Sequence, residues 1–295
     1  MGMGHPESPD RIATIVDSLK QSSFADKLYF VEAEPVSKEQ LSLAHSEAYI
    51  EEIYSRSPKN GLVWLDPDTA MNPYTLRAAE LAAGSAVQAV DLVMANKFKH
   101  IFCAIRPPGH HAIHNQAMGF CFFNNLAVGV KHAISRYGLE RIAIIDFDVH
   151  HGNGTEDIFQ NEGRVTLYSS FQHPFYPYSG THDNDFEKHT NMHPLPLPAG
   201  ADGNHYRKRV QEEWIESLHE LAPQLIFVSA GFDAHTRDPL GGLNLTNDDY
   251  LWLGQEIKSL ADQYCAGRLV SCLEGGYDLN ALADAASAWI NPWIA

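Results

Sequence analysis

The sequence predicts an α/β fold in which a mostly parallel sheet is flanked by helices. Short apolar segments, typical of strands buried on both faces, alternate along the chain with longer helix-like segments. No repeat, low-complexity tract or linker divides the 295 residues, and 44% of them are hydrophobic, which is enough for one large core. We therefore expect a single domain that covers residues 1–295.

Five segments are predicted strands because each is a short apolar run that leads into polar or turn-forming residues. They are residues 101–105, 142–145, 165–168, 225–228 and 269–273. A sheet of this kind usually has a strand before its first helix, but residues 4–9 have the glycine and prolines of a loop. We therefore expect the first strand to be missing.

Helix start and stop signals lie between these segments. Ser8-Pro9 predicts one helix start, and Asn72-Pro73 opens an alanine-rich helix that reaches about Ala95. Thr246, with Asp249 three residues later, resembles a capping box. The other predicted starts are Asn124, Asp202 and Asp278, and the predicted stops are Gly138, Pro223 and Gly267.

The net charge of −16 limits the kinds of partner. An acidic surface repels phosphate, so we expect no binding to nucleic acid or anionic membranes, whereas lysine-rich peptides or polyamines would be attracted. No apolar run approaches the roughly 18 residues of a membrane span, and signal-peptide features are lacking, so we expect a cytoplasmic protein. The four cysteines form no Cys-x-x-Cys pair, which excludes a cysteine zinc ribbon.

Four of the predicted strands lead directly into loops rich in catalytic residue types. These loops are residues 106–111, 146–152, 229–233 and 274–277. In open α/β sheets the ligand crevice lies at the carboxyl ends of the strands, so parallel neighbours would bring all four loops to one crevice. This convergence predicts an active site at that edge of the sheet.

Asp148, His150 and Asp233 are the predicted metal ligands. Asp148 and His150 lie two residues apart, so their side chains point the same way from an extended strand end, and Asp233 leaves another strand end. Three N/O ligands with an open fourth position are the pattern of catalytic zinc, whereas structural zinc usually has four protein ligands. Fe(II), Co and Mn remain alternatives because no ligand is a cysteine.

Hydrolysis of an amide by metal-activated water also needs a base, an acid and an oxyanion donor. His110 and His111 are the candidate acid and base, with Asp146 as a partner for one ring and Asn153 for the other. Tyr277 follows two glycines and is the candidate oxyanion donor. A narrow apolar channel would suit an aliphatic stem that reaches the metal, and its candidate residues are Gly119, Phe120, Tyr176 and Leu240.

Together these motifs resemble the zinc-dependent histone deacetylase superfamily, which includes bacterial deacetylase-like amidohydrolases and acetylpolyamine amidohydrolases. The resemblance runs from about Gly4 to the C-terminal helix, with the motifs in the family's order. They are Gly-His-Pro-Glu-Ser-Pro-Asp-Arg11, Arg-Pro-Pro-Gly-His110-His111, Asp146-Phe-Asp148-Val-His150-His151-Gly-Asn-Gly, Gly-Phe-Asp233-Ala-His and Glu-Gly-Gly-Tyr277.

The resemblance implies an arginase–deacetylase fold, a single α/β domain around a mostly parallel eight-stranded sheet. By it, the zinc ligands would be Asp148, His150 and Asp233. The catalytic residues would be the tandem histidines His110 and His111, backed by Asp146 and Asn153, and Tyr277. Our hypothesis for the mechanism is that His110 helps to deprotonate the water and that His111 protonates the leaving amine. The family also binds a structural monovalent cation, usually K⁺, and the corresponding positions are Asp146, Asp148, His150, Ser169 and Ser170.

Two positions depart from the family's pattern. Many members have Asp where this chain has Asn153, and a neutral amide raises the pKa of its partner histidine less than a carboxylate does. The assignment of base and acid between the two histidines therefore stays open. Phe171 stands where a histidine is common, which indicates a change in packing.

Other functions fit parts of the pattern. An arginase-like ureohydrolase would need two Mn ions and bridging carboxylates, but no Asp follows two residues after Asp233. A catalytically silent acyl-lysine binding module should have lost a ligand, a tandem histidine or the tyrosine, and all are present. Acetyl-lysine in proteins, acetylated polyamines and small acylated amines all suit the site, and the sequence does not predict the oligomeric state.

Overall fold

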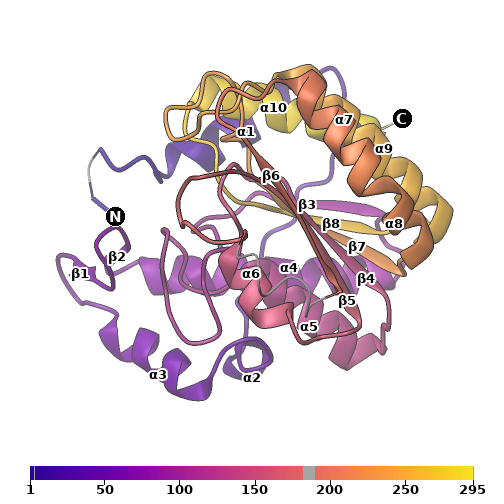
Figure 1. Cartoon of the computed structure of the whole chain (residues 1–295). Helices are drawn as coiled ribbons and strands as arrows, with labels where there is room; N and C mark the ends of the chain where they lie inside the picture. Colours follow the sequence, from indigo (N-terminus) through magenta and orange to yellow (C-terminus); the bar gives the residue numbers. More distant parts are fainter. Residues whose placement is uncertain (3, 182–189, 295) are drawn as a thin grey trace.

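The computed structural model describes residues 1–2, 4–181 and 190–294, and a sheet of six parallel strands runs through the middle of this part (Figure 1). The strand order across the sheet is β3-β8-β7-β4-β5-β6. The strands are β3 (His100–Cys103), β4 (Ile142–Asp146), β5 (Val165–Gln172), β6 (Met192–Leu197), β7 (Leu225–Ala230) and β8 (Leu269–Leu273). Every residue of β4, β7 and β8 is buried, as their continuous apolar sequences predict.

The strand count differs from the eight that the resemblance implies. In the described part of the chain the main sheet has six strands, while β1 (Val63–Trp64) and β2 (Ala70–Met71) form a separate antiparallel pair. Residues 34–36 lie earlier in the chain. They form hydrogen bonds to α4 (Thr75–Met94) and do not join the sheet. Val36 N–H donates to Glu80 O at 3.0 Å, and Glu34 N–H donates to the side chain of Gln88 at 3.2 Å.

Two layers of helices cover the faces of the sheet (Figure 1). On one face α4 packs against α5, and α6 lies beside them. On the other face α10 packs against both α1 and α9, next to α7 and α8. The remaining bounds are α1 (Asp10–Gln21), α2 (Lys38–Leu41), α3 (Glu47–Arg56), α5 (Asn125–Tyr137), α6 (Asn153–Phe159), α7 (Gly203–Glu213), α8 (Ile215–Leu221), α9 (Asn247–Tyr264) and α10 (Leu279–Ile290), with 3₁₀ turns at Ala25–Lys27 and Asn291–Ile294.

Most predicted helix boundaries are confirmed by cap geometry. The side chains of Asn124, Asp202 and Asp278 each accept an N–H of the following turn, and Thr246 forms its capping box. Two expectations were wrong in detail. Ser8 gives α1 no side-chain cap, and the helix predicted from Asp202 to Pro223 is divided at Trp214 into α7 and α8.

Strand β6 was not predicted because its sequence contains two prolines, Pro194 and Pro196. A proline cannot donate to a sheet ladder, so it is confined to edge strands and bulges. Among the described residues β6 is an edge strand that pairs only with β5. No helix among the described residues is both long and apolar enough to cross a lipid bilayer.

Candidate active site

The candidate site lies where β4 and β7 end side by side in the middle of the sheet. From β4 the chain continues to β5 on one side, whereas from β7 it continues to β8 on the other. A reversal of this kind leaves a crevice outside the two strand ends. Asp146, Asp148 and His150 come from the end of β4, and Asp233 comes from the loop after β7.

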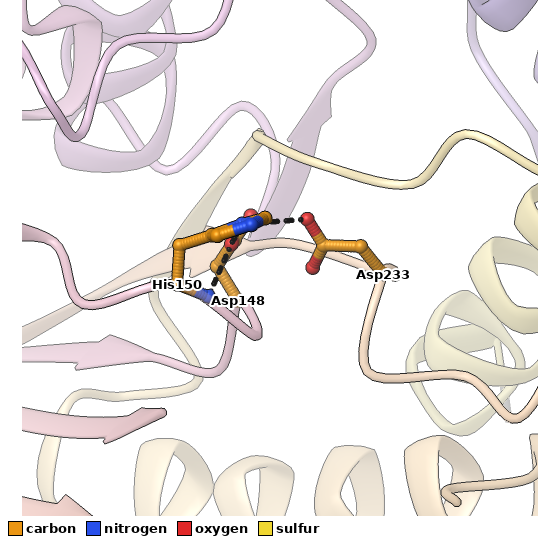
Figure 2. A group of neighbouring side chains, drawn as sticks. All are labelled: Asp148, His150 and Asp233. Carbon is orange, nitrogen blue, oxygen red and sulfur yellow. Dashed lines mark hydrogen bonds and ion pairs between the residues drawn. The ribbon is translucent and has the colours of Figure 1, made fainter. Parts of the chain in front are cut away.

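Asp148, His150 and Asp233 meet at these strand ends (Figure 2). One possible ligand atom of each lies within 4.8 Å of those of the other two. Nδ1 of His150 is 3.0 Å from Oδ1 of Asp148 and 3.2 Å from Oδ2 of Asp233. Despite this distance, the buried Oδ2 of Asp233 accepts no well-formed hydrogen bond from the described residues, which leaves an unsatisfied acceptor in the cluster.

Glycines and backbone N–H groups bring the two carboxylates together. A Cβ atom on Gly275 would lie 1.9 Å from Oδ2 of Asp233, and one on Gly231 would lie 2.1 Å from Oδ2 of Asp148. Gly275 N–H donates to Oδ2 of Asp148 at 2.8 Å, and Val149 N–H donates to Oδ1 of Asp233 at 2.9 Å. Any larger residue at either glycine would therefore displace a carboxylate from the cluster.

The charges in this cluster are strongly coupled. Burial and the nearby charge of Asp148 raise the pKa of Asp233 to about 7. Burial also acts to raise the pKa of Asp148, but His110 and His150 outweigh it and lower this pKa well below its usual range. Burial acts to lower the pKa of His150, yet its hydrogen bond to Asp148 and the nearby charge of Asp233 raise it to about 10.

It follows that a positive charge between the two buried carboxylates, those of Asp148 and Asp233, would stabilise them. A divalent cation held by the same three side chains would provide it, and a ligand set of one imidazole and two carboxylates suits zinc and related metals.

His110 and His111 lie beside the cluster, with ring centroids 4.1 Å apart. Nδ1 of His110 is 3.0 Å from Oδ2 of Asp146, and Nδ1 of His111 is 2.8 Å from Oδ1 of Asn153. These are the two partners expected from the sequence. The side-chain N–H of Asn153 donates to Sδ of Met118 at 3.3 Å, so its oxygen accepts from Nδ1–H of His111 and leaves Nε2 of that ring free.

The two adjacent histidines differ in charge preference. Burial acts to lower the pKa of His110, but the charges of Asp148, Asp146 and Glu274 outweigh it and raise this pKa well above its usual range. For His111, burial and the positive charges of His110 and His150 act together and lower the pKa well below its usual range. His110 is therefore the more readily protonated ring.

Tyr277 follows β8 and the two glycines of its loop. Its ring packs edge-on against Phe120, with centroids 6.1 Å apart, and the guanidinium carbon of Arg11 lies 4.8 Å from the ring centroid. Burial raises the pKa of Tyr277 well above its usual range. The phenol therefore keeps its proton and can donate a hydrogen bond.

The candidate channel residues lie in different surroundings. Tyr176 stands edge-on to His111 and His150, at centroid distances of 5.2 and 6.0 Å. Gly119 has a φ of +56°, and a Cβ there would lie 2.4 Å from Cδ2 of His111, so only glycine lets the chain pass this ring. Leu240 lies half-buried in the loop of Asp238, to which its N–H donates at 2.9 Å.

The residues named for a monovalent cation lie at the end of β4, in the loop that follows it and in the second half of β5. Asp146 pairs with Ser169 in the sheet, and Oγ of Ser170 donates to Asp146 O at 3.5 Å. Oγ of Ser169 is buried and has no hydrogen-bond partner among the described residues. An unsatisfied hydroxyl is compatible with an ion at this place, and K⁺ stays a prediction.

Three charged residues that support the site were given no role from the sequence, although two of them, Arg11 and Glu274, lie in the motifs quoted above. Glu274 is fully buried and accepts the N–H groups of Gly109 and His110 at 2.7 and 3.0 Å. Arg11 and Asp238 both bond the backbone of the Tyr277 loop. These partners are 39 to 265 residues apart in the sequence, and a lone charged residue has no periodic pattern that would reveal them.

The fold and the site define a class of protein, an α/β protein with a group of side chains at its strand ends that could hold a metal ion. The histone deacetylase domain model matches residues 5–292. The chain therefore belongs to the histone deacetylase family, as its motifs predicted.

Individual relatives agree with this membership. The histone deacetylase-like amidohydrolase of Pseudomonas aeruginosa is 37% identical over 278 residues, which cover 93% of this chain and 73% of that protein. Polyamine deacetylase HDAC10 of Mus musculus is 34% identical over 296 residues, which cover 94% of this chain and 43% of that protein. The crystal structure of the HDA15 HD domain superposes with a TM-score of 0.90 at 32% identity, covering 100% of this chain and 83% of that one.

Proposed function

We propose that this chain is a zinc-dependent amidohydrolase that removes acetyl or other short acyl groups from lysine side chains or related amines. The observation that carries the proposal is the meeting of the His-Asp-Asp cluster with two adjacent histidines that have unlike partners. The unsatisfied Oδ2 of Asp233 supports a metal ion held by Asp148, His150 and Asp233. When bound, this ion would activate a water molecule and polarise the acyl carbonyl.

The residues around the ion divide the proton transfers. Nε2 of His111 is free to take a proton from the attacking water, because Nδ1–H of this ring is bonded to Asn153. The same ring then gives the proton to the leaving amine. The carboxylate of Asp146, which is bonded to His110, would favour a positive charge on that ring. The hydrogen bonds thus favour His111 for the step that the sequence-based expectation gave to His110.

Tyr277 would stabilise the acyl oxygen as negative charge develops on it, because its phenol keeps the proton that it must donate. We also propose that Asp146, Asp148, His150, Ser169 and Ser170 hold a structural K⁺, which the unsatisfied Oγ of Ser169 supports.

Two substrate classes are proposed. Acylated lysine in a peptide is the first, because the rings of Tyr176 and Phe120 stand beside the functional histidine and tyrosine and would flank an aliphatic stem. Acetylated polyamine is the second, because one relative is named a polyamine deacetylase and the net charge of −16 attracts cations.

Release of acetate tests the proposal. The purified protein should contain about one zinc ion per chain and should release acetate from an acetyl-lysine peptide, an acetylated polyamine, or both. Removal of the metal with a chelator should abolish turnover, and zinc should restore it. Full turnover by metal-free protein would refute the proposed chemistry, and zinc binding with no turnover on any acylated amine would favour a silent binding module.

A further inference from the structure

A single peptide group, between Gly276 and Tyr277, is held at both ends by buried charged side chains. Nε of Arg11 donates to its carbonyl oxygen, Gly276 O, at 2.7 Å. Oδ2 of Asp238 accepts its N–H, on Tyr277, at 2.6 Å. Opposite charges therefore clamp the two poles of one peptide dipole, and they fix the plane from which the Tyr277 side chain departs.

Asp238 makes further bonds that make its own position rigid. Its Oδ2 also accepts Asp278 N–H at 3.2 Å, and its Oδ1 accepts Leu240 N–H at 2.9 Å. Its own N–H donates to His235 O at 2.8 Å, and only 7% of the residue is exposed. The carboxylate thus ties the loop after β7, which carries Asp233, to the loop after β8, which carries Tyr277.

We infer that Asp238 is a positioning residue that sets the direction of Tyr277 toward the cluster. This inference rests on the proposed function, since it assigns to Asp238 an effect on a step that Tyr277 would assist. Tyr277 is long and rigid, so a small tilt of the Gly276–Tyr277 peptide becomes a large displacement of the phenol oxygen. A displacement of about 1 Å at a reacting centre costs roughly 100-fold in rate.

Asp238→Asn is the informative substitution because the change is isosteric. Both oxygens of Asp238 accept N–H groups, so an asparagine must turn its own NH₂ toward one of them in either orientation. The Gly276–Tyr277 peptide then loses the negative charge that held its N–H, whereas Arg11 and the metal cluster are unchanged. We expect kcat to fall by about 10- to 100-fold, with KM changed by less than about 3-fold.

A double-mutant cycle separates positioning from general support of the fold. Y277F alone should lower kcat by about 100-fold, the scale of one lost oxyanion donor. If Asp238 acts through the phenol, D238N/Y277F should be no slower than Y277F, to within about 2-fold. A D238N factor that multiplies the Y277F factor would overturn the inference.

A matched control lies at the next residue. The carboxylate of Asp278 accepts Ala281 N–H at 2.7 Å and caps α10, so D278A destabilises the same helix start without removing the acceptor for Tyr277 N–H. D278A should lower Tm and leave kcat near the parental value. If D238N matches D278A in both quantities, Asp238 only supports the helix and the inference fails.

A crystal structure of D238N decides the matter even if the proposed function is wrong. If Y277F is fully active, or if no acylated amine is hydrolysed, the kinetic cycle no longer reports on Tyr277. The inference then requires that the Tyr277 ring leave its place 4.8 Å from the Arg11 guanidinium carbon. A ring that stays there in D238N overturns it.

Discussion

The two sides of the candidate site differ in the charge of their side chains. The acidic side consists of Asp146, Asp148 and Asp233, at the ends of β4 and β7. The neutral side consists of Asn153 on α6 together with Phe175 and Tyr176 in the loop after β5. Both sides are partly or fully buried, yet the first gathers carboxylates and the second has none among these residues.

The His110-His111 pair stands between these sides and shows what the difference does. The carboxylate of Asp146 favours a proton on His110, whereas the amide of Asn153 fixes the tautomer of His111 without adding charge. Two neighbours of identical chemistry thereby receive different roles. The acidic side cannot be satisfied by hydrogen bonds alone, as Oδ2 of Asp233 shows, whereas the polar groups of Asn153 all have partners.

The largest expected effect comes from removing one charge of the acidic side. Asp233→Asn keeps an oxygen for Val149 N–H but weakens the demand for a cation. We expect bound metal to fall from about one ion to below about 0.1 per chain, and turnover to fall by about 1000-fold or more, because such an ion supplies several kcal/mol to the transition state. Metal analysis and acetate release measure both quantities.

The thermal stability of the same variant is a second measurement, and here we expect no loss. Without metal, the parent must bury Asp148 and Asp233 side by side, so metal-free D233N should unfold at a Tm no lower than that of the metal-free parent. Asp91→Asn removes a carboxylate bonded to His132 at the surface and is the control, with parental metal content expected. Parental metal content in D233N would show that the acidic side is not a metal site.

A medium effect is expected when a carboxylate is moved to the neutral side. Asn153→Asp places a negatively charged carboxylate beside Nδ1 of His111. This charge raises the pKa of that ring. A base acts only when it is deprotonated, so the acidic limb of the kcat/KM profile should move to higher pH, whereas the rate at pH 7 should change little because the ring is still mostly deprotonated there.

The control for this variant is Asn204→Asp, which adds the same charge on the exposed part of α7, beside Arg207. Its pH profile should match the parental one. If the limb of N153D does not move, the base is not His111, and the comparison between the two sides loses its link to the reaction.

The sequence predicted the acidic side better than the supports beneath it, for physical reasons. Strands such as β4 and β8 are continuous apolar runs, so their ends, and the residues that follow, are visible in the sequence. Strand β6 was hidden by Pro194 and Pro196. Asp238 and Glu274 look like ordinary loop acids, and only the folded chain shows which distant N–H groups they accept.

The smallest expected effect concerns the support of the neutral side by a third histidine. Nδ1 of the buried His45 is 3.1 Å from Ile113 O, and its Nε2 accepts Asn124 N–H at 2.9 Å. The side chain of Asn124 in turn donates to Thr155 in α6, at 3.1 Å. A proton on Nε2 would face the N–H of Asn124, so this ring supports the neutral side only in its uncharged form.

Burial lowers the pKa of His45 from 6.5 to about 4, and this shift makes stability depend on pH. Between these values the unfolded chain binds a proton that the folded chain does not, so the free energy of unfolding should decrease as the pH falls from about 6.5 to about 4, by up to about 3 kcal/mol.

His45→Gln can bond both groups without titrating. In urea unfolding at pH 8, 6.5, 5 and 4 it should cost about 1–2 kcal/mol at pH 8 and lose less than the parent between pH 6.5 and 4. The variant His205→Gln, at an exposed histidine of α7, should keep the parental pH dependence. Equal slopes for H45Q and the parent would show that the neutral side does not depend on an uncharged His45.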